Sequence, residues 1–240
     1  MIREATAADD AVIDAIAREG DASAPAMYLQ LVRSQGGRLL VAEAAGRVVA
    51  YGGVVGIDGV AMLTDLFVST TARGTGIGTE LLGQLFGGTV RRMTFSSKHP
   101  AASAAYRRAG MQPRWRLLYL EGRAIGGGDL PAGPWRHDRQ SLVGAMAVQG
   151  AHVSADAVSM PAKGGISIMR LQSPHPIDTL NASLRAIPAG TVVTMCTPEH
   201  SVIATWAQSH GFSVTDHDTF CATPGVDIAE DLHCLDPGLA

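Results

Sequence analysis

The hydrophobic pattern of the first 122 residues changes repeatedly between a helical period and an extended one. Apolar residues on one helical face recur in four stretches, and short apolar, β-branched runs recur in five others. The helices are predicted around 7–17, 24–33, 77–86 and 100–109, and the strands over 38–43, 48–55, 62–68, 92–97 and 114–121. This order, α-α-β-β-β-α-β-α-β, predicts an α/β layer architecture with a mixed sheet.

The pattern weakens after residue 122. Residues 122–140 contain Gly126-Gly127-Gly128, two prolines and few apolar residues, which is typical of a linker. The remaining residues, 141–240, predict a second, smaller α/β half. Its expected strands lie at 142–148, 166–171, 192–196 and 212–214, and its expected helix carries Leu180, Leu184 and Ile187. The predicted domains are therefore 1–122 and 141–240, joined by 123–140.

Composition narrows the class of protein. The 240 residues are 46% hydrophobic with a net charge of −3, which gives no electrostatic reason to expect a nucleic-acid partner. No apolar run approaches the roughly 18 residues of a membrane span, and the first ten residues are too acidic for a signal peptide. Basic charge is almost all arginine, which we interpret as a mark of a GC-rich bacterial genome.

The cysteines and histidines lead to expectations about disulfides, cellular location and metal binding. Cys196, Cys221 and Cys234 are odd in number and have no C-x-x-C spacing, so structural disulfides are not expected and the cytoplasm is the predicted location. The eight histidines show no ligand spacing, and we expect no metal.

A glycine-rich turn carries the main chemical signal. The strand ending at Val68 is followed by Ser69-Thr70-Thr71, then by Arg73-Gly74-Thr75-Gly76-Ile77-Gly78, and then by a helix. A strand, glycine turn and helix in this order direct backbone N–H groups and a helix N-terminus at a phosphate-bearing ligand. Neither a Walker loop nor a G-x-G-x-x-G fingerprint fits, because no lysine follows Gly78 and the glycines are spaced G-x-G-x-G.

The pattern Arg73-x-x-Gly76-x-Gly78 resembles the pyrophosphate loop of the GNAT family of N-acetyltransferases, which use acetyl-CoA. A second stretch, His99-Pro100-x-Ala102-x-x-x-Tyr106-x-x-x-Gly110-Met111, is similar to the closing motif of that family. It departs from the family pattern at His99, where asparagine is usual, and at Met111, where phenylalanine is usual. The resemblance covers residues 1–122 and implies a GNAT-like mixed sheet flanked by helices.

The resemblance also implies roles for individual residues. Tyr106 would protonate the CoA thiolate, and the backbone N–H of Val68 would stabilise the oxyanion. Asp65 is a carboxylate within an apolar strand and is a candidate general base, although it could instead face solvent. The implied cofactor-binding residues are Leu66, Phe67, Val68, Arg73, Gly74, Thr75, Gly76, Ile77, Gly78, Thr79 and His99.

A weak internal repeat suggests a tandem protein. A shift of 101 residues places His200 on His99 and Gly211 on Gly110, so residues 191–222 resemble the closing strand-helix-strand of the same family. No Arg-x-x-Gly-x-Gly occurs after residue 140, and Ala207 stands where Tyr106 would be. We expect the second half to be degenerate.

The resemblance therefore implies an acetyl-CoA-dependent N-acetyltransferase that acylates a primary amine of a small molecule or peptide directly, as a monomer or homodimer without nucleic-acid or membrane partners. Two alternatives stay open. One is a CoA-binding sensor or scaffold without turnover, and the other is a transferase that uses a different acyl donor.

Overall fold

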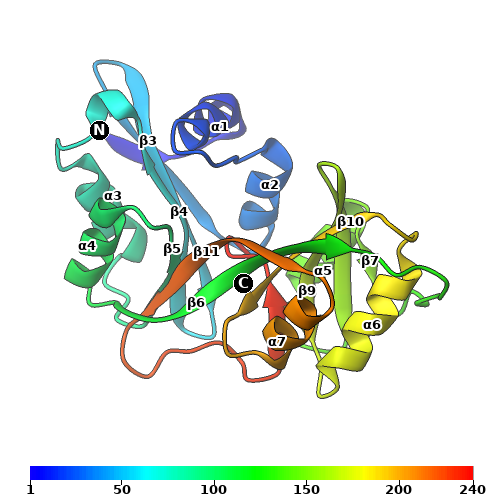
Figure 1. Ribbon diagram of the computed structural model, residues 1–240. Helices are drawn as coiled ribbons and strands as arrows, with labels where there is room; N and C mark the ends of the chain where they lie inside the picture. The colour runs from blue at the N-terminus through cyan, green and yellow to red at the C-terminus, as the bar shows by residue number, and fades with distance from the viewer. Residues whose placement is uncertain (240) are drawn as a thin grey trace. The chain divides into compact units, whose positions relative to one another are not determined.

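The structure is a computed structural model, and it describes residues 1–239. Helices and strands alternate along most of the chain (Figure 1). In chain order they are β1 (Ile2–Glu4), α1 (Asp10–Arg18), α2 (Ala26–Ser34), β2 (Arg38–Ala44), β3 (Arg47–Ile57), β4 (Val60–Val68), α3 (Ile77–Phe86), β5 (Arg92–Ser96), α4 (Pro100–Arg108), β6 (Gln112–Arg123), α5 (Gln140–Val148), β7 (His152–Val153), β8 (Ala157–Ala162), β9 (Gly165–Gln172), α6 (Pro176–Ala186), β10 (Val192–Pro198), α7 (Val202–Ser209), β11 (Ser213–Ala222) and β12 (Leu232–Leu235).

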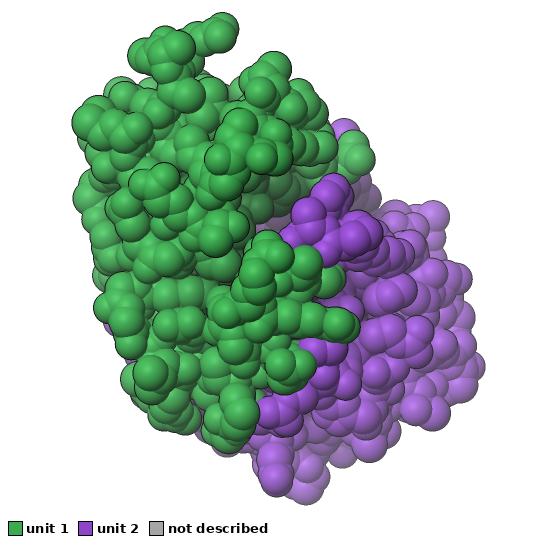
Figure 2. Space-filling view, turned by 90° about the vertical axis from the view of Figure 1, so that its left-hand side faces the viewer, with its two compact units in different colours: residues 1–94, 103–112, 222–226 green, residues 95–102, 113–221, 227–240 purple. Residues whose placement is uncertain are grey.

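The chain forms two compact units, which Figure 2 shows in different colours. Unit 1 consists of Met1–Thr94, Ser103–Gln112 and Ala222–Val226, and unit 2 consists of Phe95–Ala102, Pro113–Cys221 and Asp227–Ala240. Each unit is thus made of three stretches, whereas the sequence predicted one continuous stretch for each domain. The domain limits 1–122 and 141–240 stay a prediction.

Unit 1 contains a mixed sheet with the strand order β1-β2-β3-β4-β5. The first four strands pair antiparallel, and β4 pairs with β5 in parallel from Ala61↔Arg92 to Leu63↔Thr94. Helices α1 and α2 lie on one side of this sheet and α3 lies on the other (Figure 1). The predicted mixed sheet flanked by helices is confirmed.

Burial of the apolar stripes explains these helix positions. Leu81, Leu82, Leu85 and Phe86 are the buried residues of α3, and they are four of the five positions that the helical period marked. The fifth, Ile77, is half-buried because it lies in the first turn beside the glycine loop. Each fully buried leucine or phenylalanine contributes about 1.5–3 kcal/mol relative to exposure, so this face fixes α3 on the sheet.

The strands of unit 2 follow the order β11-β6-β10-β9-β8-β7, and β12 pairs with β9. Strand β6 pairs antiparallel with β10 from Pro198↔Leu117 to Val192↔Arg123, although even the nearer of these pairs, Val192 and Arg123, is 69 residues apart in the chain. The core of unit 2 packs α6 and α7 against these strands. It includes Leu120, Leu180, Leu184, Val193, Ile203 and Phe212.

Some elements were predicted wrongly or not predicted, most of them in the second half. Residues 142–148 form the helix α5 and not a strand, and the buried residues Leu142, Val143 and Met146 have the spacing of one helical face. Strands β1, β7, β8 and β12 were not predicted, because they are short or carry polar residues and proline. The expected strands at 166–171 and 192–196 are present as β9 and β10.

The segment predicted as a linker is held by backbone hydrogen bonds within unit 2. Ala124 N–H donates to Thr191 O at 2.9 Å, and Gly128 N–H donates to Arg185 O at 3.1 Å.

Across residues 1–239, no helix has both the length and the apolar character required to cross a bilayer.

Candidate active site

The glycine loop of unit 1 ends at the N-terminus of α3. Gly74 and Gly76 have φ of +78° and +88°, a left-handed conformation that glycine adopts without strain. A Cβ atom built at either position would have no neighbour within 4 Å, so open space lies against the backbone there. Because the first N–H groups of a helix have no partner within the helix, this space is bordered by donors that suit an anion.

Hydrogen bonds from side chains hold the first residues of the glycine loop in place. Thr75 Oγ1 donates to Ala72 O at 2.7 Å, and the exposed Arg73 side chain turns back so that Nε donates to Val68 O at 3.3 Å. Glu19, at the end of α1, accepts a bond from Thr70 N–H at 2.7 Å. This bond from Thr70 holds the pKa of the Glu19 carboxyl below its usual value. The loop is thus tethered at its start and folded on itself before α3 begins.

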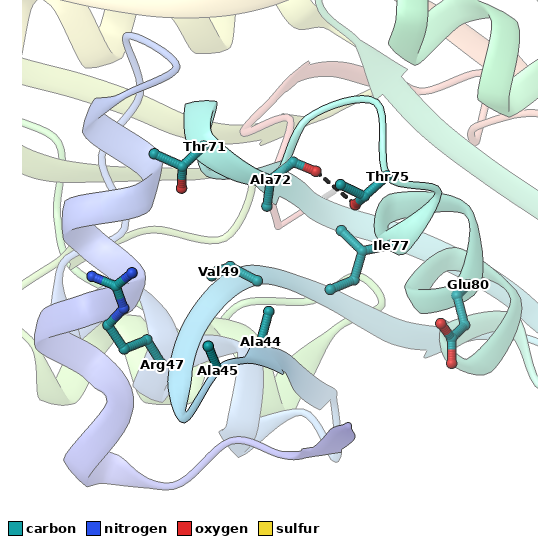
Figure 3. Close-up of a pocket in the computed structure, with 9 residues that line it drawn as sticks. All are labelled: Ala44, Ala45, Arg47, Val49, Thr71, Ala72, Thr75, Ile77 and Glu80. Atoms are coloured by element: carbon teal, nitrogen blue, oxygen red, sulfur yellow. Dashed lines mark hydrogen bonds between the residues drawn. The ribbon is translucent and has the colours of Figure 1, made fainter.

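A cavity of about 460 Å³ opens beside the loop, between the β2–β3 turn and α3 (Figure 3). Thr71, Ala72, Thr75 and Ile77 form the loop side of its lining. The β2–β3 turn contributes the other wall, and the charged side chains of Arg47 and Glu80 come from β3 and α3. The cavity shows that the loop borders space that a ligand can enter.

Asp65 lies in β4 among three hydroxyl groups. Tyr28 Oη donates to Asp65 Oδ2 at 2.6 Å, Thr64 Oγ1 donates to the same oxygen at 2.9 Å, and Tyr51 Oη donates to Oδ1 at 3.4 Å. Burial raises the pKa of the Asp65 carboxyl, and the three hydroxyl bonds offset only part of that rise. The residue nevertheless keeps some exposure to solvent. A carboxylate of raised basicity is suited to accept a proton.

A bulge in β4 sets the position of the Asp65 carboxylate. Gly53 pairs with Asp65 and Val54 pairs with Leu63, so Thr64 is the extra residue in β4. The glycine opposite is required by a close approach, because a Cβ atom at Gly53 would lie 2.4 Å from Thr64 Oγ1. The parallel pairing of β4 with β5 reaches Leu63↔Thr94 and does not include Thr64–Val68. The segment that carries Asp65 therefore keeps its ladder with β3 but has none with β5.

The residues after Asp65 alternate across the sheet. Phe67 stacks on Tyr51 with ring centroids 5.5 Å apart, on the side of Asp65. Leu66 lies on the side of α3, near the position that a Gly52 side chain would occupy. Val68 lies next to the loop, because a Cβ atom at Gly78 would be 3.0 Å from Val68 Cγ2. These three predicted cofactor residues connect Asp65 to the glycine loop.

Tyr106 lies on α4, and His99 directly precedes this helix, which is divided between the two units. Tyr106 belongs to unit 1 and is only 6% exposed, and its carbonyl accepts a bond from Met111 N–H. His99 belongs to unit 2, where its Nδ1 accepts a bond from Ala101 N–H at 3.2 Å and so caps the helix. Their predicted roles in proton donation and cofactor binding stay predictions.

The structure brings Asp65 together with residues that the sequence did not identify. Tyr28 and Thr64 bind the carboxylate and Glu19 tethers the loop, yet none of the three was a candidate. Thr64 could have been noticed as the neighbour of an aspartate in an apolar strand. Tyr28 and Glu19 carried no local signal, because their partners lie 37 and 51 residues away.

Unit 2 contains a related pair of residues. Tyr119 Oη donates to Asp218 Oδ2 at 2.7 Å, and burial raises the pKa of the Asp218 carboxyl. Cys196 is the cross-strand neighbour of Tyr119, and burial raises the pKa of its thiol, which keeps it protonated and weakly nucleophilic. No glycine loop accompanies this pair in the sequence. Within the described part of the chain, no group of three or more His, Cys, Asp or Glu side chains could hold a metal ion.

Residues 35–113 match the family model of the acetyltransferase (GNAT) domain. This range contains Asp65, the glycine loop and Tyr106. The part of the chain that is similar to a GNAT acetyltransferase domain is thus the part in which the two motifs predicted one. No curated protein sequence matches the chain significantly.

Solved structures extend the comparison to the whole chain. A candidate acetyltransferase from Pyrococcus horikoshii has a TM-score of 0.82 at 15% identity, covering 100% of this chain and 95% of its own. A phosphinothricin acetyltransferase from Sinorhizobium meliloti, solved with acetyl-CoA, aligns with 49% of this chain and 77% of its own at 23% identity and a TM-score of 0.44. A ribosomal-protein-alanine N-acetyltransferase from Brucella melitensis aligns with 49% and 88% at 26% identity and a TM-score of 0.41. The Pyrococcus protein shows that the fold of both halves occurs together in another chain.

Proposed function

We propose that this chain, whose residues 35–113 are similar to a GNAT acetyltransferase domain, transfers the acetyl group of acetyl-CoA directly to a primary amine of a small molecule or peptide. The observation that carries the proposal is Asp65. It is a carboxylate whose pKa is raised by burial and which accepts three hydroxyl bonds, in the strand that leads into a glycine loop suited to a pyrophosphate.

The glycine loop would hold the pyrophosphate of the donor. The amides at the start of α3 supply hydrogen bonds and the positive end of the helix dipole, and Gly74 and Gly76 leave the backbone accessible. The residues between Asp65 and the loop would contact the rest of the donor and direct its thioester toward Asp65. They are Leu66, Phe67 and Val68.

The reaction needs a neutral amine and a leaving thiolate. Asp65 would take a proton from the amine as its nitrogen bonds to the thioester carbon, and the N–H of Val68 would stabilise the charge on the carbonyl oxygen. The carbon–sulfur bond then breaks. Tyr106 would give its proton to the sulfur, which needs only limited help because a thiol pKa of about 8.5 makes the thiolate a fair leaving group.

The second half would contribute no donor site, since it has neither the loop nor the phenol. We therefore propose that one chain binds one molecule of acetyl-CoA and that residues 141–240 form a degenerate half. We propose that the protein is bacterial and cytoplasmic, that it acts as a monomer or homodimer, and that its acceptor is the amine of a small molecule or peptide.

Release of free thiol from acetyl-CoA with a panel of amines, with mass spectrometry of the products, tests this proposal. Amine-dependent thiol release with an acetylated product supports it, and Tyr106→Phe should then lower kcat by roughly 10²-fold with little change in donor affinity. Donor binding without turnover for any amine would favour the sensor or scaffold alternative. Turnover with another acyl-CoA alone would favour the alternative donor.

A further inference from the structure

The two carboxylate oxygens of Asp65 are bonded unequally. Oδ2 accepts two short bonds, from Tyr28 Oη at 2.6 Å and from Thr64 Oγ1 at 2.9 Å. Oδ1 accepts only the bond from Tyr51 Oη, at 3.4 Å, which is long for a hydroxyl donor. Each carboxylate oxygen can accept about two hydrogen bonds, so Oδ2 is saturated and Oδ1 retains capacity.

The three donors come from different elements, and each is fixed in a different way. Tyr28 reaches β4 from α2, across the face of the sheet. Thr64 is the bulged residue that precedes Asp65, and the close approach of Gly53 sets its place. Tyr51 is fully buried in β3, with its ring stacked on Phe67, so its hydroxyl has little freedom to move toward Oδ1.

Resting on the proposed function, we infer that Asp65 accepts the amine proton on Oδ1, and that Tyr28 and Thr64 are positioning residues that hold Oδ2 and thereby orient the carboxylate. The step balances simply. The proton leaves the amine nitrogen for Oδ1, the N–H bonding electrons stay on nitrogen, and the carboxylate becomes a neutral acid that returns the proton to solvent after acyl transfer.

The hydrogen bonds to Oδ2 also set the basicity of the carboxylate. Burial raises the pKa of Asp65, and the bond from Tyr28 is the largest of the effects that lower it again. Loss of the Tyr28 hydroxyl should therefore raise that pKa further and release Oδ2. The ring of Phe would keep the packing of α2 on the sheet.

The test follows the Asp65 carboxyl directly, by carbon-13 NMR titration of the side-chain carboxyl in the full chain, with Asp65→Asn to assign the signal. Tyr28→Phe should raise the Asp65 pKa by roughly one unit, because one unit corresponds to the loss of one such charge-assisted bond. The acid limb of kcat/KM should move up by the same amount. The plateau above it should fall by roughly tenfold as the carboxylate loses its orientation.

Thr64→Val preserves the shape of the side chain and should raise the Asp65 pKa and the acid limb of kcat/KM by a smaller amount. It replaces Tyr28→Phe as the test if that variant fails to fold. Tyr119→Phe removes the same hydroxyl from the Asp218 pair in unit 2 and should move neither the Asp65 titration nor the acid limb. An unchanged Asp65 pKa and acid limb in Tyr28→Phe and Thr64→Val would overturn the inference. The NMR titration does not depend on turnover. Full activity in Asp65→Asn would therefore refute Asp65 as the base, whereas the titration would still report whether Tyr28 and Thr64 act on its carboxyl.

Discussion

The carboxylate of Glu19 accepts the N–H of Thr70 at 2.7 Å and joins the end of α1 to the turn that opens the glycine loop. The Ser69 hydroxyl donates to the same side chain at 3.4 Å. Since α1 packs on the sheet that carries Asp65, this contact couples the donor loop to the face where the acceptor would lie.

Replacement of Glu19 by Gln should weaken acetyl-CoA binding by about threefold to tenfold while leaving the fold intact, because a neutral amide is a weaker acceptor for the Thr70 N–H. The contact lowers the Glu19 pKa, so the tether is complete above its ordinary pKa of 4.5 and is lost as pH falls through the lowered value. Calorimetric titration with acetyl-CoA near neutral pH measures the effect. Glu4→Gln, in the exposed ion pair with Arg38, is the control and should bind normally.

Gly76→Ala should reduce acetyl-CoA affinity by at least about tenfold, because the added Cβ would occupy the open space that the pyrophosphate needs. Gly88→Ala is a matched control. Gly88 has the same φ of +88° and no neighbour within 4 Å, but it follows α3 at the other end. Both variants should lose similar thermal stability, and equal loss of affinity in both would argue against the loop assignment.

Gly53→Ala should destabilise the protein by about 1–3 kcal/mol, since a Cβ atom there would lie 2.4 Å from Thr64 Oγ1 and 2.9 Å from Leu39 Cδ2. Relief of that clash should also displace Asp65 and lower kcat. Gly56→Ala lies in the same strand with open space around its Cβ position and should change neither quantity. Urea unfolding together with initial rates compares the two variants, and equal stability would contradict the close approach.

Much of unit 1 could be predicted from sequence, because its elements have clear periods and its chemistry lies in a local motif. The strand, glycine turn and helix from Val60 to Phe86 are all present. Tyr28 could not be predicted as a partner of Asp65, since a bond across 37 residues depends on how α2 packs on β4. The residues near Tyr28 in the sequence do not indicate how α2 packs.

The second half was predicted less well for two physical reasons. The apolar run of α5 is short enough to suit a strand or a helix, and only burial of Leu142, Val143 and Met146 on one face decides between them. The pairing of β6 with β10 joins strands from opposite sides of the predicted linker. The order of elements in the sequence therefore did not show that nearly all of β6 belongs to unit 2.

Asp65→Asn should make the protein more stable at neutral pH, by roughly 1 kcal/mol, as often follows removal of a functional charge. A raised pKa means that the folded state favours the protonated carboxyl. Its contribution to stability is therefore greatest below the unfolded value of 3.8 and is lost as pH rises through the raised pKa. Unfolding curves of both proteins from acid to neutral pH should converge at the acid end. A variant that is less stable at neutral pH would contradict a costly buried charge.

Asp65→Asn and Asp218→Asn together test the central claim most directly. Both aspartates lie in strands, accept a short bond from a tyrosine and have a pKa raised by burial, but only Asp65 lies beside a glycine loop. The measurement is kcat/KM for amine-dependent thiol release from acetyl-CoA, with donor affinity determined separately. We predict that Asp65→Asn lowers kcat/KM by roughly 10²-fold with donor affinity preserved, and that Asp218→Asn stays within about threefold of the unaltered protein. Loss of activity in Asp218→Asn with full activity in Asp65→Asn would contradict the account and move the reaction to unit 2.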